Sequence, residues 1–162
     1  MDKKSSQIQK ERIREIETKA IDLLDKCSAV TLASVNEKGY PRICTITKQK
    51  SEGFHKIYFV SSKRSTLNGK VTHFENNAKA SVCYSLNGDS VTLIGDMEFI
   101  ENKELQKEIW DESDRRFFKK GIDDPTYRLL RFTTIEATFW IEGKFRTVKY
   151  KSKQYRTDNQ NI

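Results

Sequence analysis

Two neighbouring segments decide how this chain is interpreted: Gly39-Tyr40-Pro41-Arg42-Ile43-Cys44-Thr45-Ile46 and Lys56-Ile57-Tyr58-Phe59-Val60-Ser61-Ser62. The first is a hairpin and a strand that carries Arg42, and the second is a strand that leads into the polar loop 61–69. The loop ends at Lys70, where a helix over 70–76 is predicted. An arginine, hydroxyl groups and a lysine at a helix start suit a phosphate group. The pattern therefore predicts a phosphate site built from both segments.

Length and composition limit the classes of protein to consider. The 162 residues suffice for one domain with its own core. No apolar run approaches the roughly 20 residues that span a bilayer, and the polar N-terminus lacks the apolar core of a signal peptide. Cys27, Cys44 and Cys83 form no C-x-x-C pair, so we expect buried thiols, no metal site and a cytoplasmic location.

The net charge of +7 fits nucleic acid, an anionic membrane or a phosphorylated ligand as partner. Six basic residues and three aromatic ones lie between Lys144 and Arg156, where no acidic residue occurs. This segment resembles a nucleic-acid patch, and the alternative is a solvated last strand followed by a frayed terminus.

The apolar pattern predicts one α+β, mainly β domain over residues 1–162. A helix is expected over 8–27, then a small antiparallel barrel over 28–143 and a basic C-terminal tail over 144–162. Gly95 indicates a bulge in its strand, and Asn102 indicates the N-cap of a helix that ends at Gly121. The predicted strands are 29–35, 42–48, 56–61, 80–86, 90–101, one or two within 127–142, and an optional last strand at 145–150.

Few side chains in this sequence suit acid–base or nucleophilic catalysis. His55 and His73 are the only histidines, and both are expected at the surface or as capping residues. The sequence contains no zinc-protease, nucleophile-elbow or dinucleotide-binding motif. Phosphate ligands without a catalytic motif indicate a protein whose chemistry belongs to a bound cofactor. No catalytic residue is assigned.

The order of segments 28–46, 56–65, 69–85 and 89–102 resembles the FMN-binding split barrel of the pyridoxamine 5'-phosphate oxidase-like superfamily. Within it, the sequence is similar to the general stress protein 26 branch over residues 12–143. The resemblance implies a six-stranded antiparallel split β-barrel with flanking helices. It also implies a homodimer that binds two FMN molecules at the subunit interface.

Carried over to this sequence, the resemblance assigns Arg42 and Lys70 to the FMN phosphate. It assigns Ser62 to the hydroxyl near the phosphate. The loop before Lys70 is longer than is usual, so Lys63 or Arg64 are alternatives to it. The resemblance also assigns residues to the flavin ring. The backbone of Ile43, Cys44 and Thr45 would lie along the ring, and Val60 and Ser61 would lie beneath it. Trp140 would lie near the ring, from the same or the partner subunit.

The C-terminal segment departs from true pyridoxamine phosphate oxidases. Residues 150–156 do not match the segment that holds the substrate in those enzymes, so oxidation of vitamin B6 is not expected. An FMN-dependent oxidoreductase that takes electrons from NADH or NADPH is the preferred interpretation, with an unknown substrate. The alternatives are a non-catalytic flavin-binding stress protein and, less favoured, a small basic barrel that binds single-stranded nucleic acid.

Overall fold

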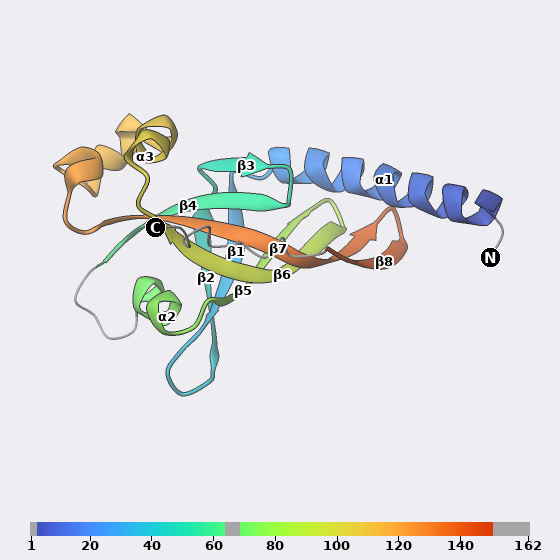
Figure 1. Ribbon diagram of the computed structural model, residues 1–162, viewed down its shortest axis with the longest axis horizontal. Helices are drawn as coiled ribbons and strands as arrows, with labels where there is room; N and C mark the ends of the chain where they lie inside the picture. Colours follow the sequence, from blue (N-terminus) through green and yellow to red (C-terminus); the bar gives the residue numbers. More distant parts are fainter. Residues whose placement is uncertain (1–2, 64–68, 151–162) are drawn as a thin grey trace, which may run out of the picture.

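The structure is a computed structural model that describes residues 3–63 and 69–150 (Figure 1). The strands form one antiparallel sheet, and the helices lie against it. In chain order the elements are α1 (Lys3–Asp25), β1 (Ala29–Val35), β2 (Pro41–Thr47), β3 (Lys50–Glu52), β4 (Lys56–Ser62), α2 (Lys70–Asn76), β5 (Lys79–Leu86), β6 (Asp89–Ile100), α3 (Lys103–Ile109), the 3-10 turns η1 (Glu112–Arg116) and η2 (Gly121–Asp123), β7 (Tyr127–Ile141) and β8 (Lys144–Lys149).

The sheet is curled into a barrel that stays open along one line. Its strand order is β2-β1-β5-β6-β7-β4-β3, and β8 pairs with the end of β7. Residues Lys48 and Gln49 lead from β2 to β3, the two ends of this order, and β2 approaches β4 without sharing a ladder with it. The predicted class, a mainly β split barrel with flanking helices, is confirmed.

The sheet has eight strands within the described residues, whereas six were predicted for the barrel. β3 is only three residues long and polar, so no periodic pattern marks it. β8 (Lys144–Lys149) confirms the optional last strand expected at 145–150, and it occupies the first part of the segment assigned to a basic tail. Residues 151–162, the rest of that predicted tail, lie outside the described residues.

Two hydrophobic clusters lie on opposite faces of the sheet. The inner cluster fills the barrel with side chains such as Leu32, Phe59 and Phe132, and α1 covers it with Ala20 and Leu24. The second cluster lies on the outer side of β4 and the start of β7, below α3. Its buried members are Tyr58, Ile109, Phe118, Tyr127 and Leu129.

Local signals in the sequence are confirmed at several turns. Asn87 and Gly88 both have positive φ, as a two-residue hairpin turn requires. The register between β6 and β7 shifts at Gly95, where a Cβ atom would lie 2.0 Å from the backbone oxygen of Thr133. The side chain of Asn102 accepts a hydrogen bond of 2.8 Å from the backbone N–H of Leu105.

Other boundaries were predicted wrongly. α1 begins at Lys3 rather than at residue 8. The helix after Asn102 ends at Ile109, because the Asp111 carboxylate caps a new turn by accepting from the N–H of Ser113 at 2.7 Å. Gly121 therefore begins η2 instead of ending that helix. The three cysteines are free thiols that are half-buried rather than fully buried.

Candidate functional site

Arg42 lies on the inner face of the sheet, near one end of β2. Side chains alternate along a strand, so Arg42 shares its face with Cys44 and with the buried Ile46. Its partner in the ladder is Ser34 of β1. Arg42 is exposed and makes no hydrogen bond or ion pair with other residues that the structure describes. Its guanidinium group is therefore available to an anion on this face.

His73 fastens α2 over the same end of β1. The Ser34 hydroxyl lies 2.8 Å from His73 Nδ1, and both residues are buried. The expectation that His73 is a surface or capping residue was therefore wrong, whereas His55 is exposed. His73 Nε2 has no hydrogen-bond partner among the described residues, although it is buried. Arg42 and the buried edge of α2 thus meet at Ser34.

The lysines differ in how free their charges are. Lys70 is the first residue of α2 and is half-buried, with no ion pair to any residue in the described ranges. Lys63 follows β4 and pairs with Glu75 of α2 at 2.5 Å. Glu75 partly neutralises the Lys63 ammonium, so the geometry favours Lys70 over Lys63 as the lysine that contacts a phosphate. Arg64, the third alternative, lies outside the described residues.

The end of β4 directs its two serines to opposite faces. Phe59 belongs to the inner cluster, and Val60 packs against the outer one. Alternation then places Ser61 on the inner face with Arg42, and Ser62 on the outer face. Ser61 pairs with Arg128 of β7 in the ladder. The assignment of Ser62 to the phosphate stays a prediction, and the alternation of side chains favours Ser61 as the serine that contacts the phosphate.

Trp140 lies far from these residues within one chain. It is exposed near the end of β7, twelve residues beyond Arg128, which faces Ser61. Twelve residues of strand extend about 40 Å. In Figure 1, β7 runs from the α3 end of the molecule to the β8 hairpin. One chain therefore does not bring Trp140 to Ser61, and a second chain would have to supply it.

Around Ile43 and Ile94 the outer face of the sheet carries one charged pair, because Glu136, the ladder partner of Ile94, lies with its carboxylate 3.8 Å from the Lys149 ammonium. Ile43 is 71% exposed and Ile94 is 49% exposed, although both are large and apolar. By alternation and register, ten uncharged side chains form the part that we call the uncharged outer face: Thr31, Ala33, Ile43, Thr45, Ser81, Cys83, Thr92, Ile94, Thr138 and Trp140. These ten side chains carry no charge and the pair of Glu136 and Lys149 lies at their border, so the face has the composition of a contact surface with a polar rim.

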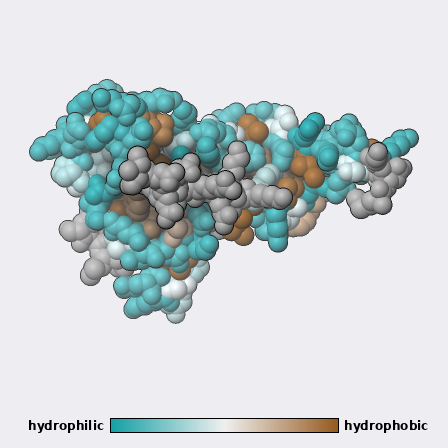
Figure 2. Space-filling model, viewed as in Figure 1, coloured by the Kyte–Doolittle hydropathy of each residue, from teal (hydrophilic) through white to brown (hydrophobic). Residues whose placement is uncertain are grey.

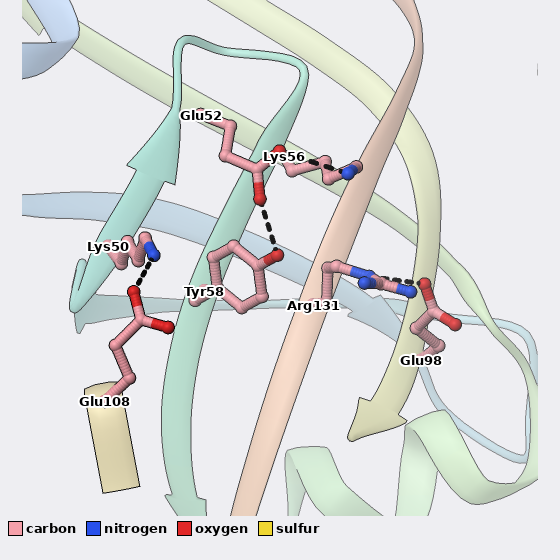
Figure 3. Close-up of polar contacts among 7 residues, drawn as sticks. All are labelled: Lys50, Glu52, Lys56, Tyr58, Glu98, Glu108 and Arg131. Carbon is pink, nitrogen blue, oxygen red and sulfur yellow. Dashed lines mark hydrogen bonds and ion pairs between the residues drawn. The ribbon is translucent and has the colours of Figure 1, made fainter. Parts of the chain in front are cut away.

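Charged groups cluster instead on the outer side of β3, β4, β7 and β6 (Figure 3). Tyr58 donates to Glu52 at 2.8 Å, and Arg131 donates to Glu98 at 2.7 Å. Burial raises the pKa of the Tyr58 phenol, and the hydrogen bond from Tyr58 lowers the pKa of Glu52. Lys56 pairs with Glu52 as well. Because its charges are paired, this network stabilises the sheet and offers no free acid or base.

A second pair, Lys50 and Glu108, joins β3 to α3.

Among residues 3–63 and 69–150, no group of three or more His, Cys, Asp or Glu side chains is placed to hold a metal ion. No helix in the described part of the chain is long and apolar enough to cross a membrane. In the described portion of the basic segment, Lys149 lies 3.8 Å from Glu136, as in an ordinary solvated strand.

The fold defines a split-barrel protein, and its sheet carries Arg42, unpaired among the described residues, near one end of β2. Residues 15–160 match the family described as pyridoxamine 5'-phosphate oxidase like, and the chain belongs to this family. No curated protein matches the sequence.

Solved structures show the same fold. A protein from Clostridium acetobutylicum related to general stress protein 26 aligns with a TM-score of 0.72 and 21% identity, over 83% of this chain and 94% of that one. A NimC/NimA family protein from the same organism aligns at 0.61 and 26% identity, over 83% and 93%. A heme binding protein from Mycobacterium smegmatis aligns at 0.65 and 15% identity, over 83% of this chain and 57% of that one.

Proposed function

We propose that this protein binds FMN, with the FMN phosphate held between β2, the end of β4 and the start of α2. The observation that carries the proposal is the position of Arg42. Among the described residues it is an unpaired cation on the inner face, and its ladder partner Ser34 contacts the buried His73, whose Nε2 has no partner there either. Ser61 belongs to the same face, and Lys70 opens the helix that His73 fastens there.

The donor set fits a phosphate group chemically. Arg42 offers a planar fork of N–H donors, Lys70 offers an ammonium, and a serine hydroxyl offers a further donor. The backbone of Ile43 to Thr45 borders the site on the exposed side of β2, where a flat ring can lie along it. Bound FMN would supply hydride-accepting chemistry, which needs positioning and exclusion of water more than acid–base side chains.

Heme is the competing cofactor, because one protein of similar fold binds it. An axial ligand for heme iron is usually a histidine, cysteine, methionine or tyrosine. His73 uses Nδ1 on Ser34 and lies buried beneath α2, and His55 packs against Phe54 and Tyr150. The donors around Arg42 suit a phosphate rather than an iron atom, so the arrangement favours FMN.

The test is titration of cofactor-free protein with FMN, followed by quenching of flavin fluorescence. Arg42→Ala and Lys70→Ala should each weaken FMN binding by about 1–3 kcal/mol, since each removes a charge-assisted contact. Arg14→Ala and Lys10→Ala, on the exposed side of α1, are matched controls that should bind like wild type. Wild-type affinity in both site variants would refute the location, and a heme spectrum after purification would refute the cofactor.

We infer that the protein is a homodimer whose uncharged outer face forms the contact. Ile43 and Ile94 are exposed on this face, and Trp140 lies too far from Ser61 to act within its own chain. A second copy packed on the face covers these side chains and brings its own Trp140 towards the ring bound along β2. Apolar surface of this kind stabilises association when a partner removes it from water.

The dimer is tested with a charge placed on the face. Ile43→Lys should convert the dimer into a monomer of 18.9 kDa, because a buried unpaired ammonium is costly and Ala33, the ladder partner of Ile43, carries no charge. Ile8→Lys, on the exposed side of α1, is the matched control and should leave the mass unchanged. Light scattering that shows a wild-type monomer loaded with FMN would refute the homodimer.

We further infer that the FMN-loaded protein is an oxidoreductase of the cytoplasm that accepts electrons from NADH or NADPH. The support is chemical: no group of His, Cys, Asp or Glu side chains among the described residues is placed to hold a metal ion, and the sequence has none of the catalytic motifs considered above, so we assign catalysis to the cofactor. Anaerobic mixing with either nicotinamide should bleach the flavin absorption band. A band that persists with both donors would favour the non-catalytic flavin-binding alternative.

A further inference from the structure

A hollow of about 700 Å³ lies where β6 ends and β7 begins, between α3, η2 and the end of α2. Small-molecule sites have volumes of about 300–1,000 Å³, so the hollow is large enough for one. Figure 2 shows hydrophobic surface between the region of α3 and that of α2. Four apolar residues line the hollow: Phe99, Ile100, Ile122 and Leu129. An apolar ligand body can therefore be accommodated there.

An unpaired polar atom lies in the wall of this hollow. Gln106 is only 7% exposed, and its Oε1 atom has no partner among the described residues. Its Nε2 donates to the backbone oxygen of Ile100 at 2.7 Å, so the carboxamide end of the side chain lies at the wall that Ile100 forms. Buried Tyr127 lines the same hollow, and its hydroxyl is unpaired too. A buried acceptor without a donor is unfavourable, and a ligand N–H can supply the missing donor.

The charge of the hollow is opposite to that of the whole chain. Four carboxylates and two cations line it, while the chain carries +7. Three of the carboxylates are engaged: Glu75 with Lys63, Asp123 with Lys103, and Asp124 with the N–H and hydroxyl of Thr126. Glu101 has no hydrogen bond or ion pair with any residue that the structure describes. It is therefore the carboxylate in the hollow that can take a new cation.

We propose that this hollow binds a small organic cation, a primary ammonium on an apolar body about the size of one ring. The ammonium donates to Gln106 Oε1 and is neutralised by Glu101, and the apolar body lies against Ile100, Ile122 and Leu129. An anion is disfavoured by the excess of carboxylates. The lining includes none of the residues assigned to the FMN phosphate, although its Arg128 and Glu75 neighbour Ser61 and Lys63, and the proposal does not depend on FMN.

The probe is benzylamine, which is protonated at neutral pH, compared with benzyl alcohol and benzoate of nearly the same shape. Each is titrated at up to millimolar concentration into isotope-labelled full-length protein, with and without FMN, and followed by two-dimensional NMR. Benzylamine should shift the side-chain amide signal of Gln106 and the backbone signals of Glu101 and Ile122. Benzyl alcohol should bind more weakly, and benzoate should shift none of these signals.

Two variants separate the two contacts. Glu101→Gln should weaken benzylamine binding at least threefold, whereas Glu104→Gln, an exposed glutamate of α3 outside the lining, should not change it. Gln106→Met keeps the side-chain length and should weaken binding at least fivefold. If Gln106→Met does not fold, the Glu101 and Glu104 pair decides alone. The proposal is overturned if benzoate binds as well as benzylamine, if no probe shifts the Gln106 signal, or if both glutamate variants behave alike.

Discussion

The hydrogen bond between Ser34 and His73 should carry a measurable part of the stability of the α2 end of the molecule. The two side chains meet at 2.8 Å and are 4% and 5% exposed. Ser34→Ala would leave the His73 ring with neither nitrogen paired among the described residues, since Nε2 already lacks a partner. Water has little access there, so the desolvation of Nδ1 is not compensated. The expected loss is about 1–3 kcal/mol in the free energy of unfolding.

The assay is urea unfolding followed by circular dichroism, at one protein concentration because dimerisation adds to apparent stability. In thermal unfolding, each kcal/mol of this loss lowers the Tm of a chain of this length by about 2–4 °C. Ser51→Ala is the matched control, because Ser51 of β3 lies outside the proposed dimer contact and its side chain makes no hydrogen bond with the described residues.

A double variant distinguishes an unpaired polar atom from lost packing. In Ser34→Ala/His73→Leu, both partners become apolar, and removal of both partners costs less than removal of one. The double variant should therefore recover part of the loss seen in Ser34→Ala. The reasoning fails if Ser34→Ala lies within about 0.5 kcal/mol of wild type, the range of ordinary surface substitutions.

Two further substitutions test other parts of the fold. Gly95→Ala should cost at least about 3 kcal/mol in thermal unfolding, because its Cβ would lie 2.0 Å from the backbone oxygen of Thr133. Gly88→Ala, where the space is open, should cost only about 1 kcal/mol, and equal losses would contradict this account. Burial raises the pKa of the Asp114 carboxyl, so this group destabilises the fold as pH rises through its folded pKa. Asp114→Asn should therefore be more stable than wild type at pH 7, with an advantage that shrinks as pH falls through the raised folded pKa and is absent below about pH 4, and parallel pH profiles would disprove it.

Much of the fold could be predicted because its signals are local. The hairpin at Asn87 and Gly88, the bulge at Gly95 and the cap at Asn102 each depend on residues within a few positions. The break after Ile109 was missed because Phe117 follows Trp110 by seven residues, a helical spacing, although residues 111–116 are all polar. The carboxylate of Asp111 decided the outcome by capping a new turn, a signal that the aspartate itself provides.

The site was predicted less completely because it depends on contacts between distant segments. His73 and Ser34 are 39 residues apart, and a single polar residue on a short helix gives no sign that it will be buried. The order of strands puts Ser34 beside Arg42, and this order is not contained in any one segment. Gln106 was missed for a similar reason. The only sign of it in the sequence is its position directly after Leu105, an apolar residue of the helix that was expected to begin after Asn102.

Strand alternation gives the most useful correction to the predicted site. Ser61 and Ser62 are adjacent, so the sequence alone allowed either of them as the serine near the phosphate at the end of β4. Because Phe59 fills the barrel and Val60 packs against the outer cluster, only Ser61 can share a face with Arg42. The same rule places Ile43 and Thr45 on the outer face, opposite to Arg42. A ligand that contacts both must therefore cross the edge of β2, with its phosphate on the inner side and its ring on the side where a second subunit would pack.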